Sequence, residues 1–165
     1  MFFVRTASER DLEQIRALLV ETWHATYDTF YGAEKVDELT ARWHSIEALK
    51  ARLRRKNAEF VVADSGSEIA GMGFAAMSDA LEKTVILHQL YVLPKYQRQG
   101  VGRDMFAELE TCFPDAEHMR VEVEPQNLHA LAFYRAHGFS EVASTAHCGG
   151  DQSGIPALVL EKRLS

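Results

Sequence analysis

The sequence predicts a single α/β domain in which helices cover both faces of a central mixed β-sheet. Apolar residues recur at helical spacing in four segments, and seven other segments are short, apolar or alternating runs typical of strands. Helical and strand segments are interleaved, which favours one layered fold. The length of 165 residues and the 47% hydrophobic content suit one domain with its own core, so we assign residues 1–165 to it.

The N-terminal third is predicted to be one strand followed by helices. Phe2–Arg5 is a short apolar strand, and Ser8 with Asp11 forms an S-x-x-D capping pattern. Positions at helical spacing follow: Leu12, Ile15, Leu18, Leu19 and Thr22. A second helical region extends from Ala33 to Arg54, and we expect a break near His44 and Ser45.

The rest of the chain is predicted to alternate between strands and helices. In order, these are strands at 58–64, 68–78 and 84–94, a helix at 101–113, a strand at 119–125, a helix at 128–137, and strands at 140–145 and 156–164. The turn Ser65–Ser67 makes a hairpin, Asn127 caps a helix, and Gly138 ends it. The predicted order is therefore β-α-α-β-β-β-α-β-α-β-β.

Composition narrows the class of partner. The formal charge of −6 and a pI near 5.6 disfavour a nucleic-acid partner, which requires clustered basic residues. No run approaches the ~20 apolar residues of a membrane span, so we expect a cytoplasmic protein without a membrane partner. The two cysteines are no disulfide framework, and the seven histidines have no metal-ligand spacing, so no metal is expected.

The segment YQRQGVGRDMF places Gly100 and Gly102 directly ahead of an apolar-periodic run, at the start of the predicted helix 101–113. The amides at a helix N-terminus bind phosphate, and glycines allow an anion to approach them. A dinucleotide fingerprint would need glycine at Met105, and no P-loop string exists. The pattern that fits is Gln/Arg-x-x-Gly-x-Gly after a strand that ends at Pro94. It comprises Gln97, Arg98, Gln99, Gly100, Val101 and Gly102.

Together with a second block, EVEPQNLHALAFYRAHGF at Glu122–Phe139, this pattern resembles the GCN5-related N-acetyltransferase (GNAT) superfamily. The detailed match covers about Leu87–Phe139. The resemblance implies the fold described above and acetyl-coenzyme A as cosubstrate.

The resemblance also implies a binding mode. The backbone of Leu90, Tyr91 and Val92 would pair with the pantetheine arm, and the amides of Gln97–Gly102 would hold the pyrophosphate. Asn127 would contact the arm of the cofactor, or act only as a helix N-cap; both roles stay open.

Two residues are the candidate catalytic groups. Glu122 matches the carboxylate that some family members use as general base, with His88 or a water relay as alternatives. If Glu122 is not the base, it is a glutamate on the solvent face of its strand. Glu124 is expected on the same face. The resemblance assigns Tyr134 to donating a proton to the coenzyme A thiolate; the alternative is a core aromatic residue.

These residues predict an acetyl-coenzyme A-dependent N-acetyltransferase that acts on a primary amine by direct attack in a ternary complex. A Cys–His acyl-enzyme is disfavoured because Cys112 falls on an apolar helix face. The competing class is a non-catalytic acyl-coenzyme A-binding or regulatory module, which would need neither Glu122 nor Tyr134. A homodimer through the final strands is compatible with the sequence.

The acceptor stays open among small amines, polyamines, amino-acid-like compounds and peptide N-termini. The family resemblance directs attention to segments 21–39 and 145–154. Aromatic and acidic residues alternate in the first: Glu21, Trp23, Tyr27, Asp28, Phe30, Tyr31, Glu34 and Asp37. These residues are either an amine-binding group or the core face of one helix and the solvent face of the next.

Overall fold

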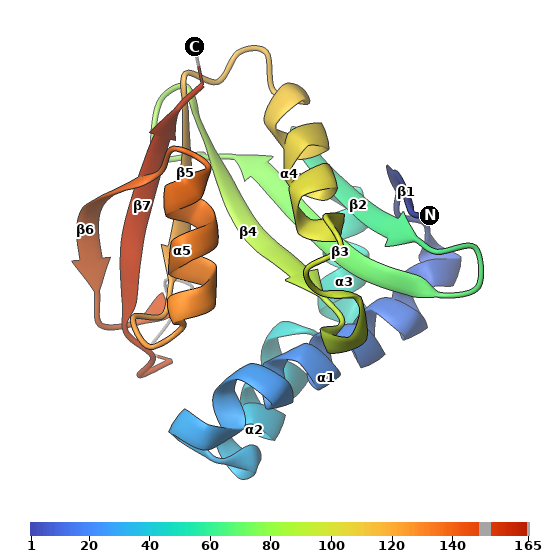
Figure 1. Ribbon diagram of the computed structural model, residues 1–165. Helices are drawn as coiled ribbons and strands as arrows, with labels where there is room; N and C mark the ends of the chain where they lie inside the picture. Colours follow the sequence, from blue (N-terminus) through green and yellow to red (C-terminus); the bar gives the residue numbers. More distant parts are fainter. Residues whose placement is uncertain (149–152, 165) are drawn as a thin grey trace. The chain divides into compact units, whose positions relative to one another are not determined.

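The computed structural model describes residues 1–148 and 153–164; residues 149–152, within the second expected acceptor segment, lie outside the described residues. The helices and strands are, in order, β1 (Phe3–Thr6), η1 (Glu9–Asp11), α1 (Leu12–Tyr31), α2 (Ala33–Trp43), α3 (Ile46–Arg54), β2 (Ala58–Asp64), β3 (Ile69–Met77), β4 (Thr84–Val92), η2 (Pro94–Tyr96), α4 (Val101–Thr111), β5 (His118–Val123), α5 (Leu128–Ala136), β6 (Ser140–Thr145) and β7 (Ala157–Arg163) (Figure 1). No helix among the described residues is long and apolar enough to cross a bilayer.

Seven strands are hydrogen-bonded in the order β1-β2-β3-β4-β5-β7-β6. Strands β4 and β5 are parallel, whereas β1–β2, β2–β3, β5–β7 and β6–β7 are antiparallel, so the predicted mixed α/β sheet is confirmed. The chain forms two compact units. The first unit is Met1–Ala76 with Gln89–Cys112, and the second is Met77–His88 with the described residues from Phe113 onward.

Helices cover both faces of the sheet in the first unit, as predicted. Leu12, Ile15 and Leu19 of α1 are almost fully buried in one core cluster with Phe60 and Phe74 of β2 and β3. Helix α4 contacts β2, and α3 contacts the same strand; Figure 1 shows α4 in front of β2 and β3 and α3 behind them. The side chains that alternate along each strand therefore enter two different helical layers.

The predicted helix 33–54 is two helices in the structure. Helix α2 ends at Trp43, and Ser45 begins α3 by accepting a hydrogen bond on Oγ from the Ala48 N–H at 3.1 Å. His44 between them has non-helical dihedrals and is only 2% exposed. The break predicted at His44 and Ser45 is confirmed, and it divides the predicted helix completely.

In the second unit the start of β4 pairs with β5, and β5 in turn pairs with β7. The parallel ladder of β4 and β5 runs from the pair Thr84–His118 to the pair Leu87–Val121. Helix α5 begins at the predicted N-cap Asn127 and ends before Gly138, whose φ of 95° requires the left-handed conformation that glycine adopts readily.

Candidate active site

The turn between β4 and α4 places Gly100 at the N-terminus of the helix and Gly102 in its first turn. Gly100 has φ 83° and ψ 6°, and it is the N-cap residue of α4. Arg98 also has a positive φ, 64°, which is uncommon for a residue with a side chain and stores strain. The structure thereby gathers Gln97–Gly102 at a helix N-terminus, where amides lack intrahelical partners.

Side chains of the turn bind its own backbone. Gln97 donates from Nε2 to the Val92 carbonyl at 3.1 Å, and Gln99 donates from Nε2 to the Lys95 carbonyl at 3.3 Å. A Cβ on Gly100 would lie 2.7 Å from Nη2 of Arg103, but this is the end of a flexible side chain that is 70% exposed and can move away. The positive φ is therefore what favours glycine at this position. The hydrogen bonds of the Gln97 and Gln99 side chains also stabilise the turn.

The cations around the turn differ in their partners. Lys95 pairs with Glu68 at 2.6 Å, and Arg103 lies 3.7 Å from Asp104. Arg98 is exposed and has no ion pair within the described residues. Arg98 is therefore the cation of this turn best able to meet an anion without giving up a partner.

The last residues of β4 lie outside its ladder with β5, which covers only Thr84–Leu87. Leu90 lies on the α4 side, because its Cδ1 and that of Leu109 both approach Gly73. Tyr91 lies on the other side, with its ring centroid 6.5 Å from that of Trp23. The expected pantetheine strand, Leu90–Val92, thus belongs to the first unit with the turn.

Asn127 and Tyr134 are two helical turns apart on α5 in the second unit. Oδ1 of Asn127 accepts the Ala130 N–H at 3.2 Å, so the N-cap role is observed. Tyr134 is 6% exposed, and its ring packs edge-on against Phe133 and Phe139 with centroid distances of 5.3 Å. The phenol is therefore held in a buried aromatic cluster.

The two candidate bases come together in the second unit. His88 and Glu122 each follow the last pair of the parallel ladder, Leu87–Val121, and both are exposed. Because registered parallel strands alternate in phase, His88 and Glu122 share the sheet face opposite to that pair.

The expectation for Glu124 was wrong. It lies beyond the end of β5 and is only 3% exposed, so it does not share the solvent face of Glu122. Its Oε2 accepts the backbone N–H of Gln126 at 2.7 Å. The carboxylate folds back onto the loop before α5, because the chain leaves the strand before residue 124.

The aromatic residues of α1 divide between core and surface. Trp23 and Tyr27 are each 6% exposed and stack with centroids 4.7 Å apart, whereas Phe30 is 43% exposed. Trp43 of α2 packs edge-on against Trp23 at 5.6 Å. Trp43 was not among the predicted residues, because it belongs to a different helix and has no periodicity that relates it to Trp23.

His24 joins α1 to α2 through two carboxylates. Its Nδ1 lies 2.6 Å from Asp28 and its Nε2 lies 2.7 Å from Asp37. The hydrogen bond with Asp28, followed by that with Asp37, raises the pKa of His24 above its ordinary value. Two of the acidic residues predicted near the acceptor are therefore already paired with a histidine.

A buried polar pair joins His44, just before α3, to Arg52 in the last turn of that helix. Arg52 contacts Nδ1 of His44 through Nη1 at 3.3 Å and also donates to the Trp43 carbonyl. Burial, and then the nearby Arg52 charge, lowers the pKa of His44 to about 3, and burial lowers the pKa of Arg52 to about 10. His44 therefore stays neutral in the folded protein at pH values where an exposed histidine is charged.

This histidine predicts a loss of stability in mild acid. Its folded pKa lies below the unfolded value of 6.5, so the unfolded state binds the extra proton and is favoured as pH falls below 6.5. Between pH 6.5 and 5 we expect the free energy of unfolding to fall by roughly 2 kcal/mol, at ~1.4 kcal/mol per pH unit. His24 has the opposite sign, because its raised pKa adds stability that is lost as pH rises above 6.5.

Urea unfolding of wild type and His44→Gln at both pH values measures this effect. The variant should be less stable at pH 6.5 and should lose little more at pH 5. His129→Gln, at an exposed histidine, should keep the wild-type pH dependence. Equal pH dependence in wild type and His44→Gln would show that His44 is not responsible.

Two alternative kinds of site would be a metal centre and a nucleophilic Cys112. The described residues contain no group of three or more His, Cys, Asp or Glu side chains that could hold a metal ion. Burial raises the pKa of the Cys112 thiol, which donates to the Glu108 carbonyl at 3.1 Å. A raised pKa is the reverse of what a nucleophilic thiolate requires.

Comparison with known proteins gives one family match and several similar structures. The family described as "Acetyltransferase (GNAT) domain" matches residues 27–158. A spermidine N(1)-acetyltransferase from Thermoplasma acidophilum is 25% identical over 140 residues, which is 82% of this chain and 86% of that protein.

Solved structures of similar fold span almost the whole chain. The PaiA N-acetyltransferase from Thermoplasma acidophilum, in complex with coenzyme A, has a TM-score of 0.85 at 23% identity and covers 99% of both chains. The ribosomal-protein-S18-alanine N-acetyltransferase from Escherichia coli has a TM-score of 0.72 at 19% identity, over 100% of this chain and 95% of that one. At these identities the likeness concerns the fold.

Proposed function

The chain belongs to the GNAT acetyltransferase family, and from this premise we propose that it transfers an acetyl group from acetyl-coenzyme A to a primary amine, with residues 1–165 acting as one domain. The observation that carries the proposal is the turn Gln97–Gly102, with positive φ at Arg98 and Gly100, at the N-terminus of α4. Its exposed cation and its helix-terminal amides suit a pyrophosphate.

The cofactor-binding residues follow from this placement. The amides of Gln97, Arg98, Gln99, Gly100, Val101 and Gly102 would hold the pyrophosphate. The backbone of Leu90, Tyr91 and Val92 would pair with the pantetheine arm in the manner of an added strand, supported by the limited ladder of β4 with β5. Asn127 would contact the arm while it caps α5.

Acetyl-coenzyme A would supply the acetyl group as a thioester. Glu122 would take the proton that the ammonium must lose before its nitrogen can attack, and its exposure on β5 makes it reachable. Tyr134 would donate its phenolic proton to the departing sulfur, and the phenolate would regain a proton from the attacking nitrogen, which loses its second proton as the amide forms. Transfer would be direct, in a ternary complex, which the raised pKa of Cys112 supports.

Polyamines are the acceptor class to test first. The spermidine acetyltransferase named above is similar over most of the chain. Helices α1 and α2 also carry exposed carboxylates, Glu21 and Glu34, in the segment that is expected to face the acceptor. Carboxylates and ring faces both attract alkyl ammonium groups.

A thiol-release assay with acetyl-coenzyme A tests the proposal directly. The panel comprises spermidine, spermine, free amino acids, aminoglycosides and short peptides with unblocked N-termini. Release of the coenzyme A thiol that depends on one of these amines supports the proposed activity. Mass spectrometry of the product then locates the acetyl group. Parallel double-reciprocal lines with a trapped acetyl-enzyme would contradict transfer in a ternary complex.

The role of Glu122 predicts a change in the pH profile. Glu122→Gln should lower kcat/KM for the acceptor by roughly 10²-fold, because the amide cannot accept the ammonium proton. The fall of kcat/KM on the acidic side of its pH profile should also become weaker. His88→Gln is the matched variant on the same sheet face. If only His88→Gln removes the acidic limb, His88 is the base and the assignment of Glu122 is wrong.

A further inference from the structure

One carboxylate outside the proposed site connects to the turn that would bind pyrophosphate. Oε1 of Glu68 accepts the Tyr96 hydroxyl at 2.6 Å and lies 2.6 Å from Nζ of Lys95. Glu68 directly precedes β3, whereas Lys95 and Tyr96 belong to η2, immediately before Gln97. A single oxygen thus holds two consecutive residues of the segment that leads into the turn.

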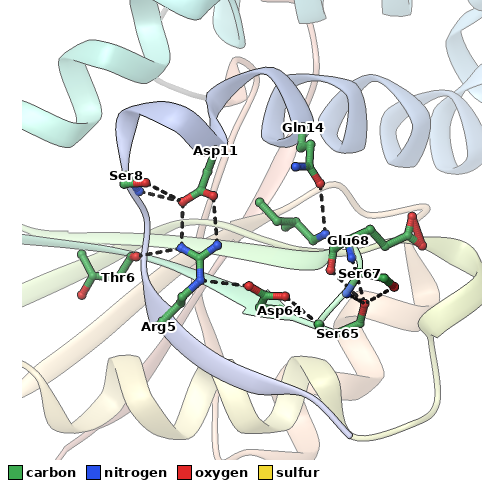
Figure 2. Close-up of polar contacts among 11 residues, drawn as sticks. Arg5, Thr6, Ser8, Asp11, Gln14, Asp64, Ser65, Ser67 and Glu68 are labelled. Atoms are coloured by element: carbon green, nitrogen blue, oxygen red, sulfur yellow. Dashed lines mark hydrogen bonds and ion pairs between the residues drawn. The ribbon is translucent and has the colours of Figure 1, made fainter.

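Glu68 is itself fixed by the hairpin turn between β2 and β3. Its backbone N–H donates to Oγ of Ser65 at 3.1 Å, and its carbonyl accepts from the Ser65 N–H at 2.9 Å. Oδ1 of Asp64 accepts the Gly66 N–H at 2.7 Å, while its Oδ2 accepts from Arg5 at 3.1 Å (Figure 2). The turn before β3 is therefore tied to β1, and its hydrogen bonds hold the backbone from which the Glu68 side chain extends.

The segment Lys95–Tyr96, just before the turn Gln97–Gly102 (the phosphate turn), also packs against the core. Tyr96 lies against the main core cluster of the first unit, and Phe2 meets its ring edge-on at 5.3 Å. Arg98, two residues after Tyr96, has a strained positive φ. Such a conformation persists only where the surrounding structure imposes it. The anchoring of Lys95 and Tyr96 supplies such a constraint.

We propose, on the basis of the coenzyme A site proposed above, that Glu68 is a positioning residue that holds the turn Gln97–Gly102 in its anion-binding conformation through Lys95 and Tyr96. It touches neither cofactor nor acceptor. Lys95 accordingly serves as an anchor of the turn instead of a phosphate ligand.

An electrostatic role and a positioning role of Glu68 predict opposite changes in the Kd for coenzyme A when Glu68 is replaced by Gln. Loss of a negative charge near the turn, and release of Lys95, would tighten the binding of an anionic cofactor if charge alone mattered. The positioning role instead predicts that the Kd for coenzyme A rises roughly threefold to tenfold, the range of one net hydrogen bond between partly exposed groups. The KM for acetyl-coenzyme A should rise equally, with kcat and the acceptor KM unchanged.

Two further variants sharpen the comparison. Tyr96→Phe removes one of the two contacts without changing the net charge, so it should weaken binding in the same direction. Glu9→Gln, at an exposed glutamate of the first unit that contacts neither Lys95 nor Tyr96, makes the same charge change and should leave the Kd unchanged.

Hydrogen exchange of the free protein separates this inference from the proposed function. Glu68→Gln should accelerate amide exchange at Tyr96 and Gln97, whose N–H groups donate to the Leu93 and Pro94 carbonyls, at an unfolding midpoint close to that of wild type. Unchanged exchange, or tighter binding of coenzyme A, would overturn the positioning role. Absence of coenzyme A binding to wild type would contradict the proposed function, while the exchange comparison would still decide whether Glu68 anchors the turn.

Discussion

Tyr134→Phe should lower kcat by roughly 10³-fold, within the range for loss of a general acid, while the Kd for coenzyme A stays within about twofold. The ring packs between Phe133 and Phe139 and is nearly buried, so phenylalanine preserves the packing and removes only the hydroxyl. Without it, the departing sulfur would have to leave as an unprotonated thiolate.

Three measurements distinguish this role from a structural one. Single-turnover kinetics give the rate of the chemical step, calorimetry gives the Kd for coenzyme A, and thermal unfolding reports any loss of packing. A large fall in kcat at constant Kd and constant unfolding midpoint supports a proton-donating hydroxyl. An unchanged kcat would show that Tyr134 is a core aromatic residue and that another group protonates the thiolate.

Local signals in the sequence predict most of the helix and strand boundaries. Ser8 and Asp11 mark the start of the first helical segment, Asn127 begins α5, and Gly138 ends it, and each is confirmed. Such signals work because a cap or a left-handed glycine is satisfied by residues within four positions. The positive φ of Gly100 follows from the same local chemistry.

Contacts between distant segments had no such signal. Glu68 and Tyr96 are 28 residues apart, and Arg5 and Asp64 are 59 apart, so neither pair shows a period that a sequence reveals. The burial of Glu124 escaped prediction for a related reason. Strand alternation places it on the face of Glu122, but the alternation ends with the strand at Val123.

The carboxylate of Asp11 should make the largest single contribution to stability of the ion pairs in the first unit. Both of its oxygens accept from Arg5, at 2.8 and 2.9 Å, and Oδ2 also accepts the Ser8 N–H at 2.8 Å (Figure 2). Its side chain is 5% exposed, against 20% for Asp64, which accepts one Arg5 hydrogen bond at 3.1 Å. The bidentate geometry joins β1 to the start of the helical layer.

Asp11→Asn should therefore lower the free energy of unfolding by about 3 kcal/mol, since it leaves the partly buried Arg5 without its main counter-charge. That loss corresponds to a fall of roughly 6–12 °C in the unfolding midpoint for a chain of this size. Asp64→Asn should cost about 1 kcal/mol. Asp115→Asn, at an exposed aspartate, should change stability by less than about 0.5 kcal/mol.

The contribution of Asp11 to the free energy of unfolding should fall as the pH is lowered. The hydrogen bonds from Arg5 lower the pKa of Asp11 to about 2, below the ordinary value of 3.8. The stabilisation is therefore complete above pH 3.8 and is lost as pH falls through 2, because the unfolded state then binds the proton more readily. Urea unfolding from pH 7 down to 2 should show the wild type and Asp11→Asn converging in stability as the carboxylate is protonated. A constant difference across this range would mean that Asp11 stabilises the fold through hydrogen bonds that its neutral form retains, and that its charge contributes nothing.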